Sequence, residues 1–372
     1  MIYLDNAATS YPKPQCVIRE LLKSFKEAPG NPGRSSHRYS VAAAEAIYEC
    51  REKISELLSA PYTEGVVFTY NATHALNLAI KTYVENGTHV LTSDIEHNAV
   101  IRPLEKLRAE GKITYSTFST DEDIEKSIEA LLTNKTKCII STLQSNVTGK
   151  SISLKKLSNV SKKHDLTLII DASQSLGHAN ISLKTTPCDV LCGAGHKGLF
   201  GIQGVGFAVF SDTTRHKSFI EGGSGTDSIN TEMPIYLPEG YEAGTLGTPA
   251  ICALRGGINY VKSYGLNLIE EELSHLTEEL NVALSSIHGI KVYSALNGIV
   301  SFNLKNIPSS VIAGLLDEKG ICVRSGLHCA PSAHKKLGTL TLGTVRASLS
   351  IQNTKKEMDR VYKIIRNIAN IY

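Results

Sequence analysis

Apolar and polar positions follow two alternating periods along the first 210 residues. Short apolar runs rich in β-branched residues are separated by longer stretches in which apolar residues recur at helical spacing. The run LTLIIDAS (166–173) is the clearest strand, and NATHALNLAIKTYVE (71–85) has helical spacing. The other predicted strands are 65–70, 88–93, 112–118, 137–143, 188–195 and 204–210, and the other predicted helices lie near 99–110, 121–132 and 153–164. This alternation predicts an α/β fold with a mainly parallel sheet covered by helices on both faces.

The pattern changes after about residue 245. A long helical region, roughly 248–286, precedes short strand-like runs, a helix near 309–319 and an amphipathic helix over 354–371. This mixture predicts a smaller α+β domain, and a chain of 372 residues is longer than one hydrophobic core usually serves. The Gly/Pro-rich stretch 221–249 is the predicted surface loop between the two parts. We expect a large domain over 16–245 and a small domain formed by 1–15 and 246–372.

Charge and composition give no sign of a nucleic-acid or membrane partner. The 39 Lys and Arg residues nearly balance the 36 Asp and Glu residues, which leaves a formal charge of +3. No apolar run is long enough to span a bilayer, and the first residues, MIYLDNAATSYPKP, have no apolar signal core. The eight cysteines are scattered without a CxxC pair, which is typical of reduced thiols. These features predict a cytoplasmic location.

Two residues suggest cofactor chemistry. Lys197 stands in the small-residue segment GHKG, and a lysine whose amine is desolvated can form a Schiff base. Asp171 ends the clearest predicted strand, where ligands bind in open α/β sheets, and its carboxylate could pair with a protonated ring nitrogen. Taken alone, the lysine is more often a surface residue, and a helix N-cap is the alternative for the aspartate.

Other polar residues follow predicted strand ends. Thr73 opens a helix directly after a strand, a position that suits a phosphate, although a plain cap is an equal alternative. His97 in SDIEHNAV could stack on an aromatic ring, but a lone histidine is more often structural. Asn146 in SNVTG has turn chemistry as its alternative.

Nine motifs in a fixed order carry a family resemblance. They are YLDNAAT, NPGR, EHNAV, SNVTG, DASQ, GHKG, EAGT, RSGLHCA and VRASL, and they span nearly the whole chain. Each motif is weak alone, but together they resemble the cysteine desulfurases of the class V aminotransferase family. The segment RSGLHCA is similar to the group with a short, constrained active-site loop, the SUF-type group.

The resemblance implies a pyridoxal 5'-phosphate enzyme of fold type I, normally a homodimer. It implies that Lys197 holds the cofactor and that His97 stacks on its ring. Asp171 would pair with the ring nitrogen, and Gln174 with the ring hydroxyl. Thr73 and His196 would hold the phosphate, and Thr245 would reach the phosphate from the partner subunit. Arg346 would bind the carboxylate of L-cysteine, with Asn146 nearby. Cys329 would accept the sulfur as a persulfide, L-alanine would leave, and an acceptor protein would take the sulfur.

Two positions depart from the family pattern, and metal binding is not expected. Ala194 stands where the family usually has Ser or Thr, so one phosphate hydroxyl is missing unless Ser173 or Ser175 compensates. His74 replaces the usual acidic residue after the phosphate threonine. Cys329 has His328 beside it, but the spaced partners of a zinc site are absent from the sequence.

Competing functions remain open from the sequence. A selenocysteine lyase, or an aminotransferase, racemase or other lyase of the same fold, would share most of these residues. A catalytically silent scaffold is the alternative from another class. The presence of Cys329 within RSGLHCA argues against other enzymes of the fold. The joint presence of Lys197, Cys329 and Arg346 argues against a scaffold.

Overall fold

A mainly parallel sheet forms the centre of the larger part of the molecule. The computed structural model describes residues 1–33, 35–215, 217 and 219–372, so Arg34 of the NPGR motif lies outside the described residues. The sheet order is β2 (Val66–Thr69), β8 (Gly206–Phe210), β7 (Val190–Ala194), β6 (Thr167–Asp171), β5 (Thr136–Thr142), β3 (His89–Ser93) and β4 (Thr114–Phe118). Strands β7, β6, β5, β3 and β4 are parallel to one another, whereas β8 is antiparallel to both of its neighbours. The predicted α/β fold with a mainly parallel sheet is confirmed.

Two hydrophobic cores lie on the two faces of this sheet, because successive side chains of a strand point to opposite faces. In β6, Leu168 and Ile170 belong to one core and Ile169 to the other. The first core is completed by α2 (Arg38–Leu58), α5 (Ile124–Glu129), α6 (Leu154–Lys163) and α7 (Thr248–Tyr264). The second is completed by α3 (Ala72–Tyr83) and α4 (Asn98–Ala109). This double cover explains why the strands read as nearly continuous apolar runs.

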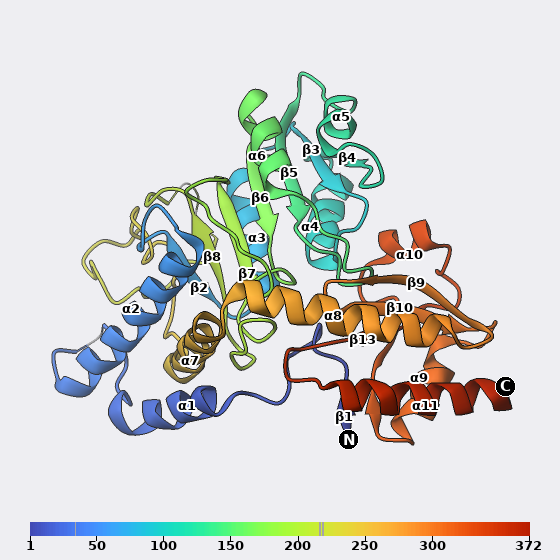
Figure 1. Ribbon diagram of the computed structural model, residues 1–372. Coiled ribbons are helices and arrows are strands. Elements are labelled where there is room, and N and C mark those ends of the chain that lie inside the picture. The colour runs from blue at the N-terminus through green and yellow to red at the C-terminus, as the bar shows by residue number, and fades with distance from the viewer. Residues whose placement is uncertain (34, 216, 218) are drawn as a thin grey trace.

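The smaller part combines an antiparallel sheet with helices. Its sheet order is β12 (Arg324–Gly326), β13 (Thr344–Ser348), β10 (Ile299–Leu304) and β9 (Ile290–Leu296). The helices are α8 (Leu266–Ser285), α9 (Ser309–Asp317), α10 (Pro331–Leu337) and α11 (Lys355–Ile371). A capping box formed by Thr354 and Glu357 begins α11. Figure 1 shows α8 running from the large part along the smaller one.

The N-terminal residues join this smaller part. Strand β1 (Ile2–Tyr3) pairs with β11 (Ile321–Cys322), and Asp5 bridges to Ser348. Figure 1 shows the N-terminus beside the C-terminal elements. Helix α7 contributes Leu254 to a core of the large part and Val261 to the core of the smaller part. Because α7 contributes to both cores, the predicted boundary between a large domain (16–245) and a small domain (1–15 and 246–372) stays a prediction.

Two local features differ from the pattern analysis. The predicted helical region 248–286 is two helices, because Gly265 at their junction has a φ of 96°, in the left-handed region that ends a helix. Helices α1 (Gln15–Glu27) and α2 were not assigned from the sequence. Helix α1 lies along α7 and contributes Val17 to the core of the smaller part.

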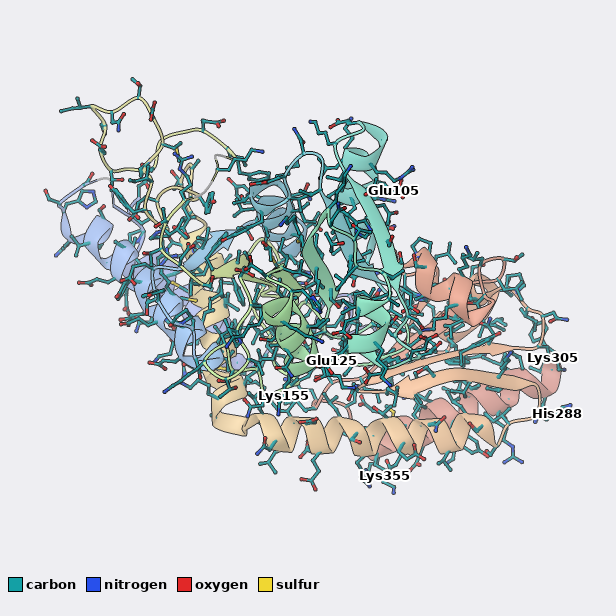
Figure 2. The ribbon with its side chains drawn as sticks, turned by 90° about the horizontal axis from the view of Figure 1, so that it is seen from above. Glu105, Glu125, Lys155, His288, Lys305 and Lys355 are labelled. Atoms are coloured by element: carbon teal, nitrogen blue, oxygen red, sulfur yellow. The ribbon has the colours of Figure 1, made fainter. Side chains whose placement is uncertain are left out.

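Charged side chains mark the outside of the molecule. Figure 2 places His288 and Lys305 at the outer end of the smaller part, with Lys355 on its rim. Within the described residues, no helix is both long and apolar enough to cross a membrane.

Candidate active site

A cavity of about 110 Å³ lies at the carboxyl ends of the parallel strands. Loops that follow β2, β3, β5, β6 and β7 all reach it, which is where ligands bind in open α/β sheets. The predicted site residues that line it are Thr73, His97, Asn146, Asp171, Gln174, His196 and Lys197. Seven positions spread over 125 residues of sequence are thus brought together by the order of the strands.

Lys197 has the character of a reactive amine. Burial lowers the pKa of Lys197 to about 8, although the carboxylate of Asp171 opposes this change. Asp171 itself is 4% exposed and is oriented by Ser173, whose backbone N–H (2.9 Å) and hydroxyl (2.5 Å) both donate to Oδ1. A lysine with a lowered pKa is partly neutral near pH 8, which a nucleophilic amine requires.

His97 presents an uncharged ring to the same cavity. It is the N-cap of α4, and its Nδ1 accepts a hydrogen bond from the N–H of Ala99 at 3.0 Å. Burial lowers its pKa to about 4, against the opposing effect of Asp171. A neutral imidazole fixed in this way suits stacking on a flat ligand.

The preceding residue, Glu96, was not singled out from the sequence. Its side chain is fully buried, and burial raises its pKa to about 8. Oε1 accepts hydrogen bonds from the Ser93 hydroxyl and from the N–H of Thr142 at 2.8 Å. Among the described residues, Oε2 has no partner. Glu96 is therefore a buried carboxylic acid that ties the loop before His97 to the end of β5.

The first turn of α3 forms another wall of the cavity. Asn71 caps this helix by accepting from the N–H of His74 at 2.9 Å, and Thr73 lines the cavity. First-turn N–H groups without intrahelical partners attract an anion. Nearby, His196 Nδ1 is buried, and no hydrogen bond to it is found within the described residues. Both features fit a phosphate group.

The side chain of Ala194 also lines this cavity and offers no hydroxyl. The two serines considered as substitutes are engaged elsewhere. Ser173 donates its hydroxyl to Asp171, and Ser175 donates its hydroxyl to the carbonyl of Ala172 at 3.2 Å. Neither hydroxyl is therefore available in this arrangement to replace the missing one.

The N-terminal segment supports the cavity from behind. The carbonyl oxygen of His196 accepts from Thr9 Oγ1 (3.1 Å), from the N–H (3.0 Å) and Oγ (3.2 Å) of Ser10, and from Lys13 Nζ (3.1 Å). Gln174 Nε2 donates to the carbonyl of Ala7 at 3.0 Å. Sequence patterns do not predict these contacts, because Thr9 near the start of the chain meets a carbonyl 187 residues later.

Arg346 lies next to the cavity without lining it. Its guanidinium is 1% exposed, donates through Nη2 to Asp5 Oδ1 (2.8 Å) and through Nη1 to the carbonyl of Asn146 (2.9 Å). Within the described part of the chain, its Nε is buried without a partner. Asp5 was not singled out from the sequence, yet it is the ion-pair partner of the residue predicted to bind the substrate carboxylate.

Cys329 stands on a loop that both parts of the molecule hold. The residue is exposed and lines a groove that also includes Thr73 and His97. His328 and Cys329 have φ values of 50° and 57°, in the left-handed region. Asn146 Nδ2 donates to the carbonyl of His328 (2.7 Å), and the N–H of Asn98 donates to the carbonyl of Cys329 (2.7 Å). Arg324 Nη2 lies 3.6 Å from Cys329 Sγ.

Thr245 lies away from this cavity in its own chain. It lines a separate hollow together with Gly33 and Tyr236, and its hydroxyl accepts from Asn31 Nδ2 at 3.4 Å. Its predicted contact from a partner subunit stays a prediction. Within the described residues, no group of three or more His, Cys, Asp or Glu side chains is arranged to hold a metal ion.

The family model for aminotransferase class-V matches residues 2–361. The chain therefore belongs to this family. A protein of Methanothermobacter thermautotrophicus named probable cysteine desulfurase is 33% identical, with 100% of this chain and 95% of the relative covered. A protein of the same name from Halalkalibacterium halodurans is 30% identical, with 98% and 92% covered. The predicted family is thus confirmed, whereas the SUF-type group stays a prediction.

Solved structures agree with this placement. The apo structure of a cysteine desulfurase from Thermococcus onnurineus superposes with a TM-score of 0.93 at 26% identity, covering 100% of this chain and 95% of that one. A cysteine desulfurase from Escherichia coli, at 22% identity and a TM-score of 0.89, shows the same fold over 99% of this chain and 94% of its own.

Proposed function

We propose that this protein is a pyridoxal-phosphate-dependent cysteine desulfurase, which converts L-cysteine to L-alanine and a persulfide on Cys329. The observation that carries the proposal is the pairing of two nucleophiles at one site. Lys197 has its pKa lowered within the cavity, and Cys329 lines the adjoining groove, with Thr73 and His97 common to both. Relatives named cysteine desulfurase match over the full length of the chain, which supports the same activity.

The cavity has a suitable group for each part of the cofactor. Lys197 would hold it covalently, Asp171 would pair with the ring nitrogen, and the flat face of His97 would stack on the ring. The first turn of α3, with Thr73, and the unpartnered Nδ1 of His196 would bind the phosphate. Gln174, which also donates to Ala7, would reach the ring hydroxyl. The bound cofactor would supply the electron-withdrawing ring that makes the substrate α-proton removable.

The chain itself would provide binding, proton transfer and sulfur transfer. Arg346 would bind the substrate carboxylate through its unpartnered Nε, with Asn146 fixing its position. Lys197 would carry the α-proton, because an amine with a pKa of about 8 can take and return a proton near neutrality. The Cys329 thiolate would attack the substrate sulfur. The substrate C–S bond would break with its electrons left on carbon, that carbon would gain a proton, and alanine would leave.

Cys329→Ala separates this function from other reactions of the same fold. We expect the purified variant to keep the visible absorption of the bound cofactor and its change on adding L-cysteine. It should form no persulfide and release little alanine. Visible spectra, alanine release and mass spectrometry of the peptide containing residue 329 measure these properties. Cys322→Ala is the matched control, because that thiol lies on β11 outside the cavity. Undiminished alanine release by Cys329→Ala would disprove the proposed role.

The same assay addresses the alternatives left open by the sequence. L-Selenocysteine is given in parallel, because a selenocysteine lyase would release alanine from it in strong preference to L-cysteine. An aminotransferase would produce a keto acid in place of alanine. We infer cysteine as the substrate because the Cys329 thiol stands at the site mouth with Arg324 beside it.

The proposal extends to partners. A homodimer is supported by Thr245, because this residue does not line the Lys197 cavity of its own chain. We also propose an acceptor protein for the sulfur, because the segment RSGLHCA resembles the short loop of the SUF-type group and the carbonyl of Cys329 accepts a hydrogen bond from the N–H of Asn98. A fixed thiol cannot carry its persulfide far. The eight cysteines are all free, in keeping with the predicted cytoplasmic location.

A further inference from the structure

Three buried side chains form a continuous hydrogen-bonded chain beneath the Cys329 loop. Thr339 Oγ1 lies 2.8 Å from His334 Nδ1, and His334 Nε2 lies 3.1 Å from His328 Nδ1. The far nitrogen of His328, Nε2, lies 3.4 Å from the carbonyl oxygen of Arg324. Exposure is 3% for Thr339, 0% for His334 and 2% for His328, so water does not compete for these bonds. We refer to these three side chains as the Thr339 relay.

The direction of every bond in the relay follows from the backbone carbonyl at its Arg324 end. The carbonyl of Arg324 can only accept, so His328 Nε2 carries a hydrogen. Burial lowers the pKa of His328 to about 2 and that of His334 to about 4, so both rings are neutral near pH 7. His328 Nδ1 must then accept from His334 Nε2, and His334 Nδ1 must accept from the Thr339 hydroxyl. The Arg324 carbonyl therefore sets the tautomers of both histidines, and the Thr339 hydroxyl completes the chain by donating to His334 Nδ1 at 2.8 Å rather than to the His334 carbonyl at 3.4 Å.

The relay ends on the segment that carries the reactive thiol. His328 precedes Cys329, and both residues adopt left-handed φ values that side chains with a β-carbon disfavour. Such a backbone persists only where surrounding contacts hold it. Asn146 and Asn98 hold the two carbonyls from the large part, and the relay holds the His328 ring from the smaller part.

We propose that His334 and Thr339 are positioning residues for Cys329, and that Arg324, rather than His328, is the cationic neighbour of its thiol. The ring of His328 is engaged at both nitrogens, with His334 and with the Arg324 carbonyl, so its side chain serves the backbone. The guanidinium of Arg324 contacts Sγ at 3.6 Å. By binding the carbonyl of Arg324 and fixing the residue before Cys329, the relay sets the geometry of that contact. This inference deepens the proposed function and rests on it for the effect on turnover.

Thr339→Val and Thr339→Ser form the matched pair that tests the relay. Valine keeps the shape of threonine and removes the hydroxyl, whereas serine keeps the hydroxyl. In Thr339→Val, we expect the rate at which iodoacetamide alkylates Cys329 to fall about fivefold, since one buried hydrogen bond is lost. The kcat for alanine release should fall by a similar factor, with the KM for L-cysteine and the cofactor spectrum unchanged. Thr339→Ser should restore both rates. Mass spectrometry of the Cys329 peptide separates this thiol from the other seven.

A second pair tests the middle of the relay. His334→Gln keeps an N–H that can donate to His328 Nδ1, and His334→Leu does not. We expect the glutamine variant to alkylate faster than the leucine variant. Alkylation needs no turnover, so it tests the relay even if the protein acts on a substrate other than cysteine. Unchanged or faster alkylation in Thr339→Val would overturn the proposal. A parallel loss of cofactor absorption and alkylation would also overturn it, by showing a general structural role.

Discussion

The two reactive residues of the site are prepared in opposite ways. Lys197 acts from within a cavity, and its pKa is lowered by burial among side chains at the carboxyl ends of the parallel strands. Cys329 is exposed, and it is held by hydrogen bonds to the backbone of its loop from Asn98 and Asn146. Burial can change the chemistry of an amine without any charged partner. A sulfur carrier must stay accessible, so its surroundings control its position instead.

The largest expected effect is a loss of activity that removes the function of Lys197 and leaves the reactivity of Cys329 nearly unchanged. In Lys197→Ala, alanine production should fall by ~10³-fold or more, because the anchor of the cofactor and the proton carrier are lost together. Alkylation of Cys329 by iodoacetamide should stay within about twofold of the wild-type rate, since its loop is held by residues other than Lys197. The measurement is alanine release beside alkylation of the Cys329 peptide. Full alanine production in this variant would refute the assignment of Lys197.

Much of the cavity around Lys197 could be predicted from the sequence, since the residues that line it directly follow strands. Asp171 ends a run of apolar residues that only a doubly covered strand would have, and Thr73 and His97 begin helices after such runs. The carboxyl ends of parallel strands meet at one edge, so strand prediction alone brings these residues near one another. Even there, Glu96 was missed, because a glutamate beside a histidine gives no sign in the sequence that its carboxyl is enclosed.

The structure of the loop that carries Cys329 was much less predictable from the sequence. The motif RSGLHCA identified Cys329 by resemblance, but the left-handed backbone at His328 and the relay through His334 depend on packing. Asp5 and Lys13 were missed for a related reason. Asp5 contacts Arg346, which lies 341 residues later, and Lys13 contacts the His196 carbonyl, 183 residues later, and no local pattern records such contacts. Hydrophobic periodicity predicts helices and strands, but it does not predict the conformation of the loops that connect them.

The next largest effect is a pH-dependent change in the free energy of unfolding caused by Glu96, the buried acid beside His97. The folded pKa of Glu96 is raised to about 8, above that of an exposed carboxyl, so the folded state binds the proton more tightly. Its contribution to stability is present below the unfolded pKa and is lost as pH rises toward 8. Between pH 5 and pH 7, wild type should lose about 2–3 kcal/mol relative to Glu96→Gln, which cannot ionise. Thermal unfolding of both proteins across this range provides the measurement.

The sign of the slope is the decisive result. Glutamine leaves an unpartnered N–H₂ where Oε2 stands, so the variant can be the less stable protein at pH 5. The difference should nevertheless shrink or reverse by pH 8. If the two proteins keep a constant difference over the whole range, Glu96 does not ionise on unfolding as proposed. The segment RSGLHCA that carries Cys329 contains no Asp or Glu, so Cys329→Ala should follow the wild-type pH profile of stability.

The smallest effect concerns the phosphate end of the cavity, where Ala194 leaves a gap in the hydrogen-bonding groups. Its side chain lines the cavity at 2% exposure, and the hydroxyls of Ser173 and Ser175 are directed to Asp171 and Ala172. Ala194→Ser adds one donor of nearly the same size. A hydrogen bond to a charged group is worth about 1.5 kcal/mol or more, so cofactor retention should tighten by roughly tenfold. Equilibrium dialysis followed by visible absorption measures cofactor retention.

Ala172→Ser is the control, because that residue is buried in the sheet core rather than lining the cavity. Equal cofactor loss from wild type and Ala194→Ser would show that Thr73 and His196 already satisfy the phosphate, and that the cavity end needs no further donor.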